Sequence, residues 1–221
     1  MYRNLIAFAV AILTSTCFAQ DKFEVIESQQ SVEVKLNGKP FTIYQTQYGA
    51  KPILWPIVGP TGVEMTRSYP QTEKGKSDER KDHIHHRSFW FTHGDVNGIS
   101  FWHENDKHGN TVHRKFTQIK GGAKAVIAST NDWVGPDGKK HCEDHRTYTF
   151  STGKNKRYID AEIIVKASYG DVVFGDTKEG CFGVRTRGSM KVDAKKGGKI
   201  VSSDGKIDAA AGGPRAAWGG S

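Results

Sequence analysis

Residues Ser31 to Tyr44 read Ser-Val-Glu-Val-Lys-Leu-Asn-Gly-Lys-Pro-Phe-Thr-Ile-Tyr, and they contain the clearest structural signal of the chain. Apolar residues at positions 32, 34 and 36 alternate with polar ones, which is the period-two pattern of a strand with one buried face. Asn37-Gly38 follows, and both residues tolerate the positive φ angles of a tight turn. Phe41 to Tyr44 supplies the return strand, so the stretch predicts an antiparallel β-hairpin.

The same alternation continues through the rest of the chain. Arg146 to Ser151 alternates, and Tyr158 to Lys166 places Ile159, Ala161, Ile163 and Val165 on one face. Turn signals separate such runs, at Gly121-Gly122, Pro136-Asp137-Gly138, Gly153-Lys154-Asn155 and Gly197-Gly198. No window of a dozen residues shows helical periodicity. Many short strands at this spacing predict an all-β fold, an antiparallel β-sandwich or barrel.

Composition predicts one globular domain. The chain has 221 residues, of which 36% are hydrophobic and 25% are charged. Its net charge of +8 comes from basic residues that are spread along the sequence among acidic ones. Because no basic helix or aromatic-basic ribbon is present, we expect no nucleic-acid partner. The positive balance indicates a solvated surface, or one suited to an acidic substrate.

The first nineteen residues have the pattern of a signal peptide. A positive start at Arg3 precedes the apolar run Leu5 to Leu13, and Cys17-Phe18-Ala19 offers a cleavage site. The apolar run is shorter than the ~20 residues of a spanning helix, and no later segment approaches that length. We therefore expect no membrane span and an exported, periplasmic or extracellular protein with a mature domain at 20–221.

Removal of the signal peptide would leave Cys142 and Cys181. In an oxidising compartment the two thiols either pair or remain as two buried small side chains, and the sequence leaves both alternatives open. From Ser202 onward the composition shifts to alanine and glycine, and Trp218 stands almost at the terminus. This pattern predicts that the β-sandwich domain is incomplete at its C-terminus.

Histidines gather in one part of the sequence, since seven of the nine fall between His83 and His113. Histidine titrates nearest neutral pH and is the commonest metal ligand. The densest stretch is Asp82-His83-Ile84-His85-His86-Arg87. If Arg87 to His93 forms a strand, Phe89, Phe91 and His93 share the core side with Arg87, and Trp90 faces the other way. We expect a loop before this strand and a turn at Asp95 to Gly98.

Two chemistries fit this cluster. For acid–base catalysis, the candidates are His85, His86 and His93 with Glu179, which lies in the glycine-bracketed segment Phe174 to Arg185. For metal binding, the extended His83-Ile84-His85 places two imidazoles on one side, although the spacing matches no specific zinc signature. The candidate substrate-binding residues are Arg87, Trp90, Asp95, Asn97 and Lys178.

Several segments resemble a bacterial family of unknown function that is often labelled "methane oxygenase PmoA-like". The matching segments are Lys51 to Pro56, Pro60 to Arg67, Asp82 to Trp102, Asn131 to Trp133 and Phe174 to Arg185. The methane oxygenase label does not fit, because such a subunit is embedded in a membrane. The family is similar to galactose-mutarotase-like β-sandwiches, which bind or transform sugars with histidine and a carboxylate. The resemblance also implies further strands and another histidine motif beyond Trp218.

These observations give three functional hypotheses. The first is an exported carbohydrate-active enzyme, such as an epimerase, lyase or hydrolase, that uses His/Glu acid–base chemistry on a small-molecule or carbohydrate substrate. The second is a metal-dependent enzyme that uses the His83 to His93 cluster, with a divalent metal as its cofactor. The third is a non-catalytic glycan-binding module. The sequence leaves the substrate, the reaction class and the oligomeric state open.

Overall fold

The computed structural model describes residues 21–211 of the chain and contains ten β-strands and three short 3-10 helices. The signal peptide predicted at 1–19 and the terminal Trp218 lie outside the described residues. The strands are β1 (Phe23–Glu27), β2 (Ser31–Leu36), β3 (Lys39–Tyr48), β4 (Lys51–Ile57), β5 (Phe89–His93), β6 (Asn110–Lys120), β7 (Ala125–Val134), β8 (Lys140–Gly153), β9 (Lys156–Lys166) and β10 (Gly180–Val184). The helices are η1 (Gly188–Met190), η2 (Val192–Ala194) and η3 (Asp208–Ala210).

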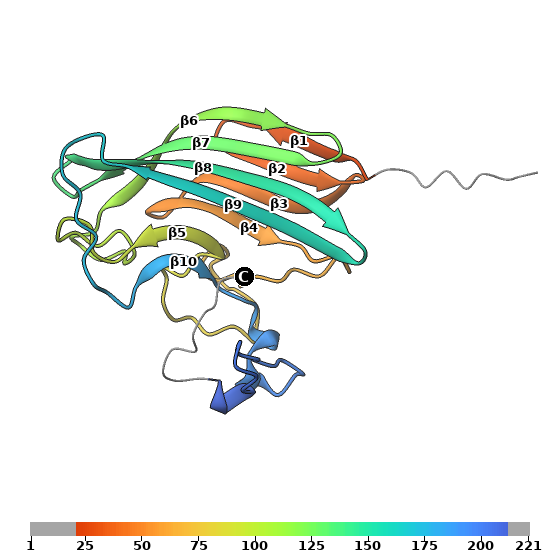
Figure 1. Cartoon of the computed structure of the whole chain (residues 1–221). Helices are drawn as coiled ribbons and strands as arrows, with labels where there is room; N and C mark the ends of the chain where they lie inside the picture. The colour runs from red at the N-terminus through yellow and green to blue at the C-terminus, as the bar shows by residue number, and fades with distance from the viewer. Residues whose placement is uncertain (1–20, 212–221) are drawn as a thin grey trace, which may run out of the picture.

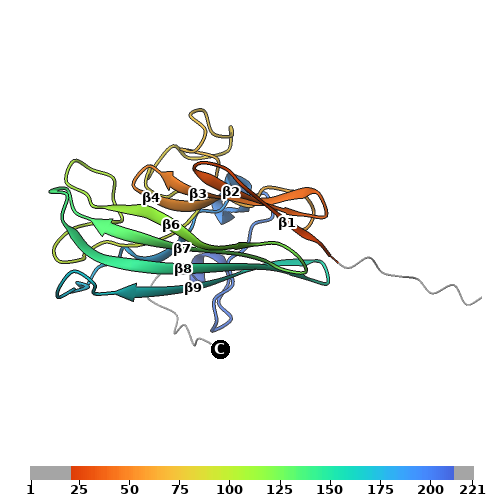
Figure 2. The ribbon, with the colours of Figure 1, turned by 90° about the horizontal axis from the view of Figure 1, so that it is seen from above.

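The strands form two antiparallel sheets that stack face to face (Figures 1 and 2). Six strands pair in the order β1-β2-β3-β4-β5-β10, and four pair in the order β6-β7-β8-β9. The predicted hairpin joins β2 to β3, where Leu36 pairs with Lys39 and both Asn37 and Gly38 have positive φ. The predicted all-β antiparallel sandwich is therefore confirmed.

Aromatic side chains from both sheets fill the main core. Tyr44 and Phe89 of the six-stranded sheet pack against Tyr148 of the four-stranded sheet, with ring centroids 5.9 Å apart in each pair. Burial of each such side chain stabilises the fold by about 1.5–3 kcal/mol. The Tyr44 hydroxyl also forms a 3.0 Å hydrogen bond with the Ser129 hydroxyl, so its burial leaves no unpaired polar group.

A second apolar cluster lies on the outer face of the six-stranded sheet. Because Phe89 points toward Tyr148, its neighbour Trp90 in β5 faces away from the sandwich core. There Trp90 packs with Ile53 and Trp102. The prediction that Trp90 and the phenylalanines of this strand face opposite sides is thus confirmed.

The predicted start of this strand was wrong by two residues. Ser88 has a φ of 61°, which breaks the extended backbone, and β5 begins at Phe89. Arg87 therefore lies outside the strand alternation. The residues before it, 58–88, connect β4 to β5 without a helix or named strand, as the loop prediction required. Val96 bridges to Ile99 across Asn97 and Gly98, which confirms the predicted turn.

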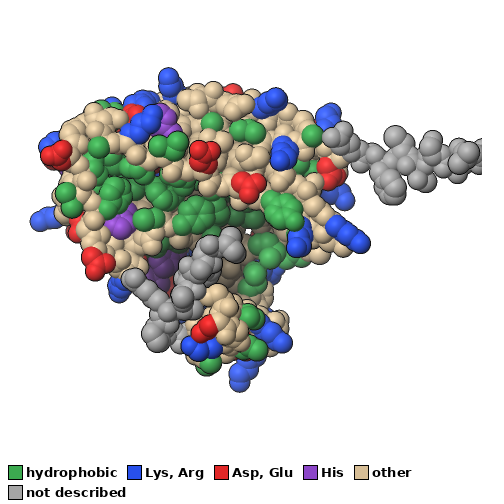
Figure 3. Space-filling view, in the orientation of Figure 1, with side chains coloured by type: hydrophobic (Ala, Val, Ile, Leu, Met, Phe, Trp, Pro, Cys, Tyr) green, Lys and Arg blue, Asp and Glu red, His purple; other side chains and the backbone are tan. Residues whose placement is uncertain are grey.

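The sandwich is open along one side, between β9 and β10. The pairing register of β9 with β8 places Ile159, Ala161, Ile163 and Val165 on one inward face, as predicted, yet none of these residues is fully buried. Phe182 and Val184 of β10 are 45% and 51% exposed. Figure 3 shows hydrophobic side chains gathered across this face. The core is thus less covered here than between β1–β4 and β6–β8.

Two further sequence expectations can be compared with the structure. Within residues 21–211, no helix has the length and hydropathy that a membrane crossing requires. Cys142 is buried, Cys181 is exposed, and both thiols are free. Of the two alternatives left open for the cysteines, the structure therefore excludes the disulfide, but only Cys142 is a buried small side chain.

Candidate functional site

The loop of residues 58–88 carries the histidine cluster, and one buried arginine fixes the loop's shape. Arg67, which is only 2% exposed, donates hydrogen bonds to the backbone carbonyls of Arg80, His83 and His86 and to the Asp82 carboxylate. A guanidinium presents its donors in a rigid fork, so these contacts define where the chain turns. The His86 amide also donates to the His83 carbonyl over 3.0 Å, which closes a tight turn.

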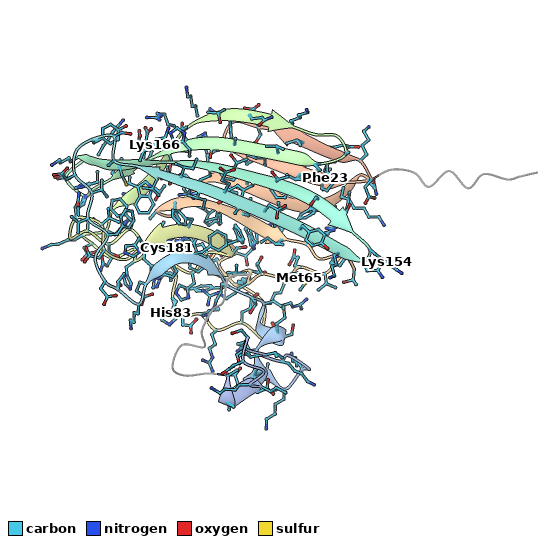
Figure 4. All side chains as sticks on the ribbon, viewed as in Figure 1. Phe23, Met65, His83, Lys154, Lys166 and Cys181 are labelled. Atoms are coloured by element: carbon cyan, nitrogen blue, oxygen red, sulfur yellow. The ribbon has the colours of Figure 1, made fainter. Side chains whose placement is uncertain are left out.

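This turn brings three imidazoles together. His83, His85 and His86 each offer a ring nitrogen, and the three nitrogens lie within 4.8 Å of one another. The rings of His83 and His86 are stacked at 4.7 Å, and the His85 ring meets both edge-on. Figure 4 shows His83 beneath β10 and away from Lys154, which lies at the tip of the β8–β9 hairpin. The sequence predicted His83 and His85 as ligands, and the structure adds His86.

Two imidazoles of the cluster, those of His85 and His86, are kept neutral. Burial, followed by the charge of Lys51 and the neighbouring histidines, lowers the pKa of His85 to about 4. Burial, followed by His85 and the guanidinium of Arg185, lowers the pKa of His86 to about 3. A neutral imidazole has a free lone pair, so the two rings are in the protonation state that a metal ligand needs.

Tryptophans form the floor beneath these histidines. The His86 ring stacks on Trp90 with centroids 5.3 Å apart and an interplanar angle of 24°, and Trp102 lies 5.0 Å from Trp90. The indole nitrogens of Trp55, Trp90 and Trp102 are buried and have no hydrogen-bond partner among the described residues. The floor is therefore formed by buried aromatic rings, whose faces pack well against apolar surface.

A network of buried ionic groups lies beside these tryptophans. The Lys51 ammonium, which is fully buried, lies 3.3 Å from the Glu104 carboxylate and donates to the Trp102 carbonyl. Arg87 donates from Nε to the same carboxylate over 2.8 Å. Burial lowers the pKa of Lys51 to about 8 even though Glu104 opposes the shift. Burial raises the pKa of Glu104, but Arg87 and Lys51 outweigh it and keep that pKa low.

Glu179 reaches the cluster through His103. The His103 Nε2 lies 3.9 Å from a Glu179 carboxylate oxygen, and the His103 ring lies 4.9 Å from the His85 ring. Gly94 permits this approach, because a Cβ at that position would stand 2.7 Å from the Glu179 Cβ. The structure therefore brings the predicted Glu179 within two contacts of the predicted His85, and His103 is the residue that joins them.

His93 is not brought to the cluster. It shares the side of β5 that carries Phe89 and Phe91, opposite to Trp90 and His86. Its Nε2 lies 3.0 Å from the Gly175 carbonyl, and its Nδ1 lies 3.3 Å from the Cys181 sulfur. The Gly175 carbonyl only accepts, so Nε2 carries the proton and Nδ1 faces the thiol with its lone pair.

The predicted substrate-binding residues lie in different settings. The Asp95 carboxylate accepts the Gly98 amide within the turn, and the Asn97 side chain bonds the backbone of residues 171 and 173. Arg87 is held by Glu104, as described above. The Lys178 side chain is 90% exposed beside Glu179. Trp90 is 2% exposed and lies under His86. Of the five residues, Trp90 contacts the histidine cluster, through His86, and Lys178 lies 3.9 Å from Glu179.

Sequence reasoning missed the residues that assemble the site. Arg67, Asp82, Lys51, Glu104 and Arg185 follow no periodic pattern, and four of them stand in or beside polar stretches that resemble ordinary surface. Lys51 directly precedes an apolar run. A charged residue at the start of such a run was the one sequence signal of the buried Lys51–Glu104 ion pair. The partner of each charge comes from a distant segment, so the pairing required the fold.

A family model describes this chain over residues 31–220 as a family of unknown function, DUF6807. The match begins at β2 and includes the loop of residues 58–88, β5 and β10. No curated protein and no solved structure matches the chain. Since the model covers most of the sequence, the chain belongs to the DUF6807 family.

Proposed function

We propose that the protein is a metal-dependent enzyme acting on a carbohydrate, with the metal held by His83, His85 and His86. One observation carries this proposal: the convergence of three imidazole nitrogens within 4.8 Å on a single turn. Three histidines with a fourth position left for water or substrate form the ligand pattern of catalytic zinc sites. Imidazole donors also suit copper, iron and nickel.

The protonation state and the solvent exposure of these histidines both suit a metal ion. The low pKa values of His85 and His86 leave both rings ready to coordinate at neutral pH. His83 is exposed and the other two rings are partly exposed, so an ion has a path to the site. Nitrogens about 2.1 Å from a tetrahedral ion stand roughly 3.4 Å apart, a spacing that small rotations of the rings supply.

The surrounding residues have defined roles in the proposal. A bound metal would polarise a substrate oxygen or lower the pKa of a bound water. His103 and Glu179 form the neighbouring pair for proton transfer, because their side chains face each other beside His85. Trp90 and Trp102 provide the apolar wall. The sugar substrate is supported by this aromatic wall and by the resemblance to galactose-mutarotase-like proteins.

Metal analysis of the purified protein tests the proposal. We expect about one equivalent of a transition metal per chain, and we expect His86→Gln to lower the metal content at least tenfold. His108→Gln is the matched control, because it removes a histidine that bonds only to the adjacent Gly109 carbonyl. Wild-type protein that stays metal-free after incubation with zinc, copper, iron and nickel salts would refute the metal centre.

A second candidate is metal-free acid–base catalysis on a sugar by the same residues, and the 3.9 Å approach of His103 to Glu179 favours it. Treatment of the wild type with chelators separates the two candidates. In a metal enzyme it abolishes turnover, whereas in a metal-free enzyme turnover survives; Glu179→Gln loses turnover in both and keeps the metal in the first. Export to the periplasm or outside the cell belongs to both candidates as a proposal from the N-terminal sequence.

A further inference from the structure

Next to the histidine cluster lies a cavity of about 270 Å³ with a mainly basic border. It is formed by the loop of residues 58–88 and by the chain that follows β10. Its charged lining residues are Arg67, Glu79, Arg80, Arg185 and Lys191. Four of the five are cationic, and this excess of positive charge inside a concave surface favours an anionic ligand.

The nearby carboxylates leave this charge only partly balanced. Glu79 accepts the backbone amides of Ser68 and Tyr69, so its oxygens are already committed to holding the loop. Arg67 and Arg185 donate to the same oxygen, Oδ1 of Asp82, over 2.7 and 2.8 Å. Two guanidiniums that share one carboxylate oxygen lack the paired, bidentate partners that such groups prefer.

One buried donor in this cavity has no partner. Arg67 lines the cavity and is 2% exposed, and its Nε–H has no hydrogen-bond acceptor among the described residues. Arg67 therefore keeps one hydrogen-bond donor without a partner in the described part of the chain, and a buried donor that stays unpaired costs free energy.

The cavity shares its walls with the histidine cluster. The Arg185 Nη1 lies 3.4 Å from the His86 Nδ1, and Arg67 Nη2 donates to the His83 and His86 carbonyls. A ligand group held by these arginines is therefore adjacent to the imidazoles. The volume lies just below the usual range for ligand pockets, so it suits one charged group or a single sugar ring.

We propose that this cavity binds the anionic group of the substrate, a carboxylate or sulfate on a sugar, and thereby places the sugar against the histidine cluster. The inference rests on the proposed function for its link to catalysis, but the anion site stands on the arginines alone. Guanidinium groups match the planar geometry of a carboxylate, and Lys191 adds a further positive charge, 3.9 Å from Asp193, to the lining.

Binding of matched probes tests this site. Glucuronate, glucose and inorganic sulfate are titrated into the full chain by calorimetry at low and high salt. We expect glucuronate and sulfate to bind and glucose to bind at least tenfold more weakly. We expect Arg80→Gln to weaken glucuronate binding several-fold, because it removes one rim charge, which pairs with the exposed Asp193. Lys154→Gln is the control, since it removes the same charge from the tip of the β8–β9 hairpin, away from His83 (Figure 4).

The outcomes separate this inference from the proposed function. Equal binding of glucuronate and glucose, no binding of either anion, or equal effects of Arg80→Gln and Lys154→Gln would overturn the anion site. Metal content measured on the same samples reports on the histidine cluster independently. Anion binding that depends on Arg80 in a protein without metal would uphold the inference and reject the metal centre. A sulfate-binding protein that rejects glucuronate would assign the cavity to sulfated sugars.

Discussion

At the residue scale, the site depends on polar side chains that bind backbone rather than on the histidines alone. Arg67 holds three carbonyls and the Asp82 carboxylate, so its removal would leave several buried acceptors unpaired. We expect Arg67→Met to lower the free energy of unfolding by about 3 kcal/mol and to abolish metal binding, measured by urea denaturation and metal analysis. Arg80→Gln, which breaks an exposed ion pair, should cost less than about 1 kcal/mol. Equal losses in the two variants would refute this role of Arg67.

Arg185 gives a second prediction at this scale. A guanidinium only donates, so its 3.4 Å contact with His86 uses the Nδ1 lone pair and leaves the proton on Nε2. A metal ligand at Nε2 requires the opposite tautomer, and the positive charge of Arg185 also repels a cation. We expect Arg185→Gln to bind zinc several-fold more tightly than the wild type in a competition assay with a chromogenic chelator. Unchanged or weaker affinity would show that Arg185 does not compete with the metal.

The residue scale also shows where sequence reasoning was informative. The density of histidines predicted the cluster because neighbours in sequence stay neighbours in a tight turn. The position of His93 on the other face followed from strand alternation, yet the sequence alone could not tell which face the loop histidines join. Arg67 and His83 are joined by a hydrogen bond that spans sixteen positions, and no local pattern encodes such a contact.

At the scale of elements, the join between β5 and β10 holds the site together. Gly183 stands opposite Trp90, and a Cβ added to it would lie 2.3 Å from the Trp90 ring. We expect Gly183→Ala to force Trp90 or β10 to move, to cost about 2 kcal/mol of stability and to disorder the His86–Trp90 stack. Tryptophan fluorescence and denaturation measure the two effects. Val184→Ala on the same strand is the control, because Val184 is 51% exposed, and an equally large effect there would contradict the close-packing argument.

Strand alternation predicted β2, β8 and β9, since each has one apolar face. It did not predict the sheet order, in which β10 pairs with β5 across more than eighty residues of chain. Nor did it predict the start of β5, because Ser88 adopts a positive φ that serine rarely takes. These exceptions border the histidine cluster, and they arise from tertiary packing that local propensity does not describe.

At the scale of the whole molecule, the neutral histidines link stability to pH. The folded-state pKa values of His85 and His86, about 4 and about 3, lie below the ordinary value of 6.5. Between pH 6.5 and about 3 the unfolded chain therefore binds protons that the folded chain rejects, so stability falls as the pH is lowered through this window. Allowing for solvent screening, we expect the pair to account for about 2 kcal/mol.

Urea denaturation from pH 7 to 4 in the presence of EDTA measures this dependence. His85→Gln/His86→Gln should show a shallower loss of stability than the wild type, because glutamine does not titrate. His145→Gln serves as the control, since its ring pairs with Glu143 on the outer surface of β8. Parallel curves for the wild type and the double variant would contradict the low pKa values.

One consequence concerns how members of this family can diverge. Arg67 donates hydrogen bonds to the backbone at positions 80, 83 and 86. The location of the imidazoles therefore depends on this one side chain and not on the length of the segment between residues 67 and 80. We expect insertions or deletions between residues 70 and 78 to change the outline of the loop while the three imidazoles keep their positions. Relatives could therefore differ in the surface beside the histidine cluster and still share the cluster itself.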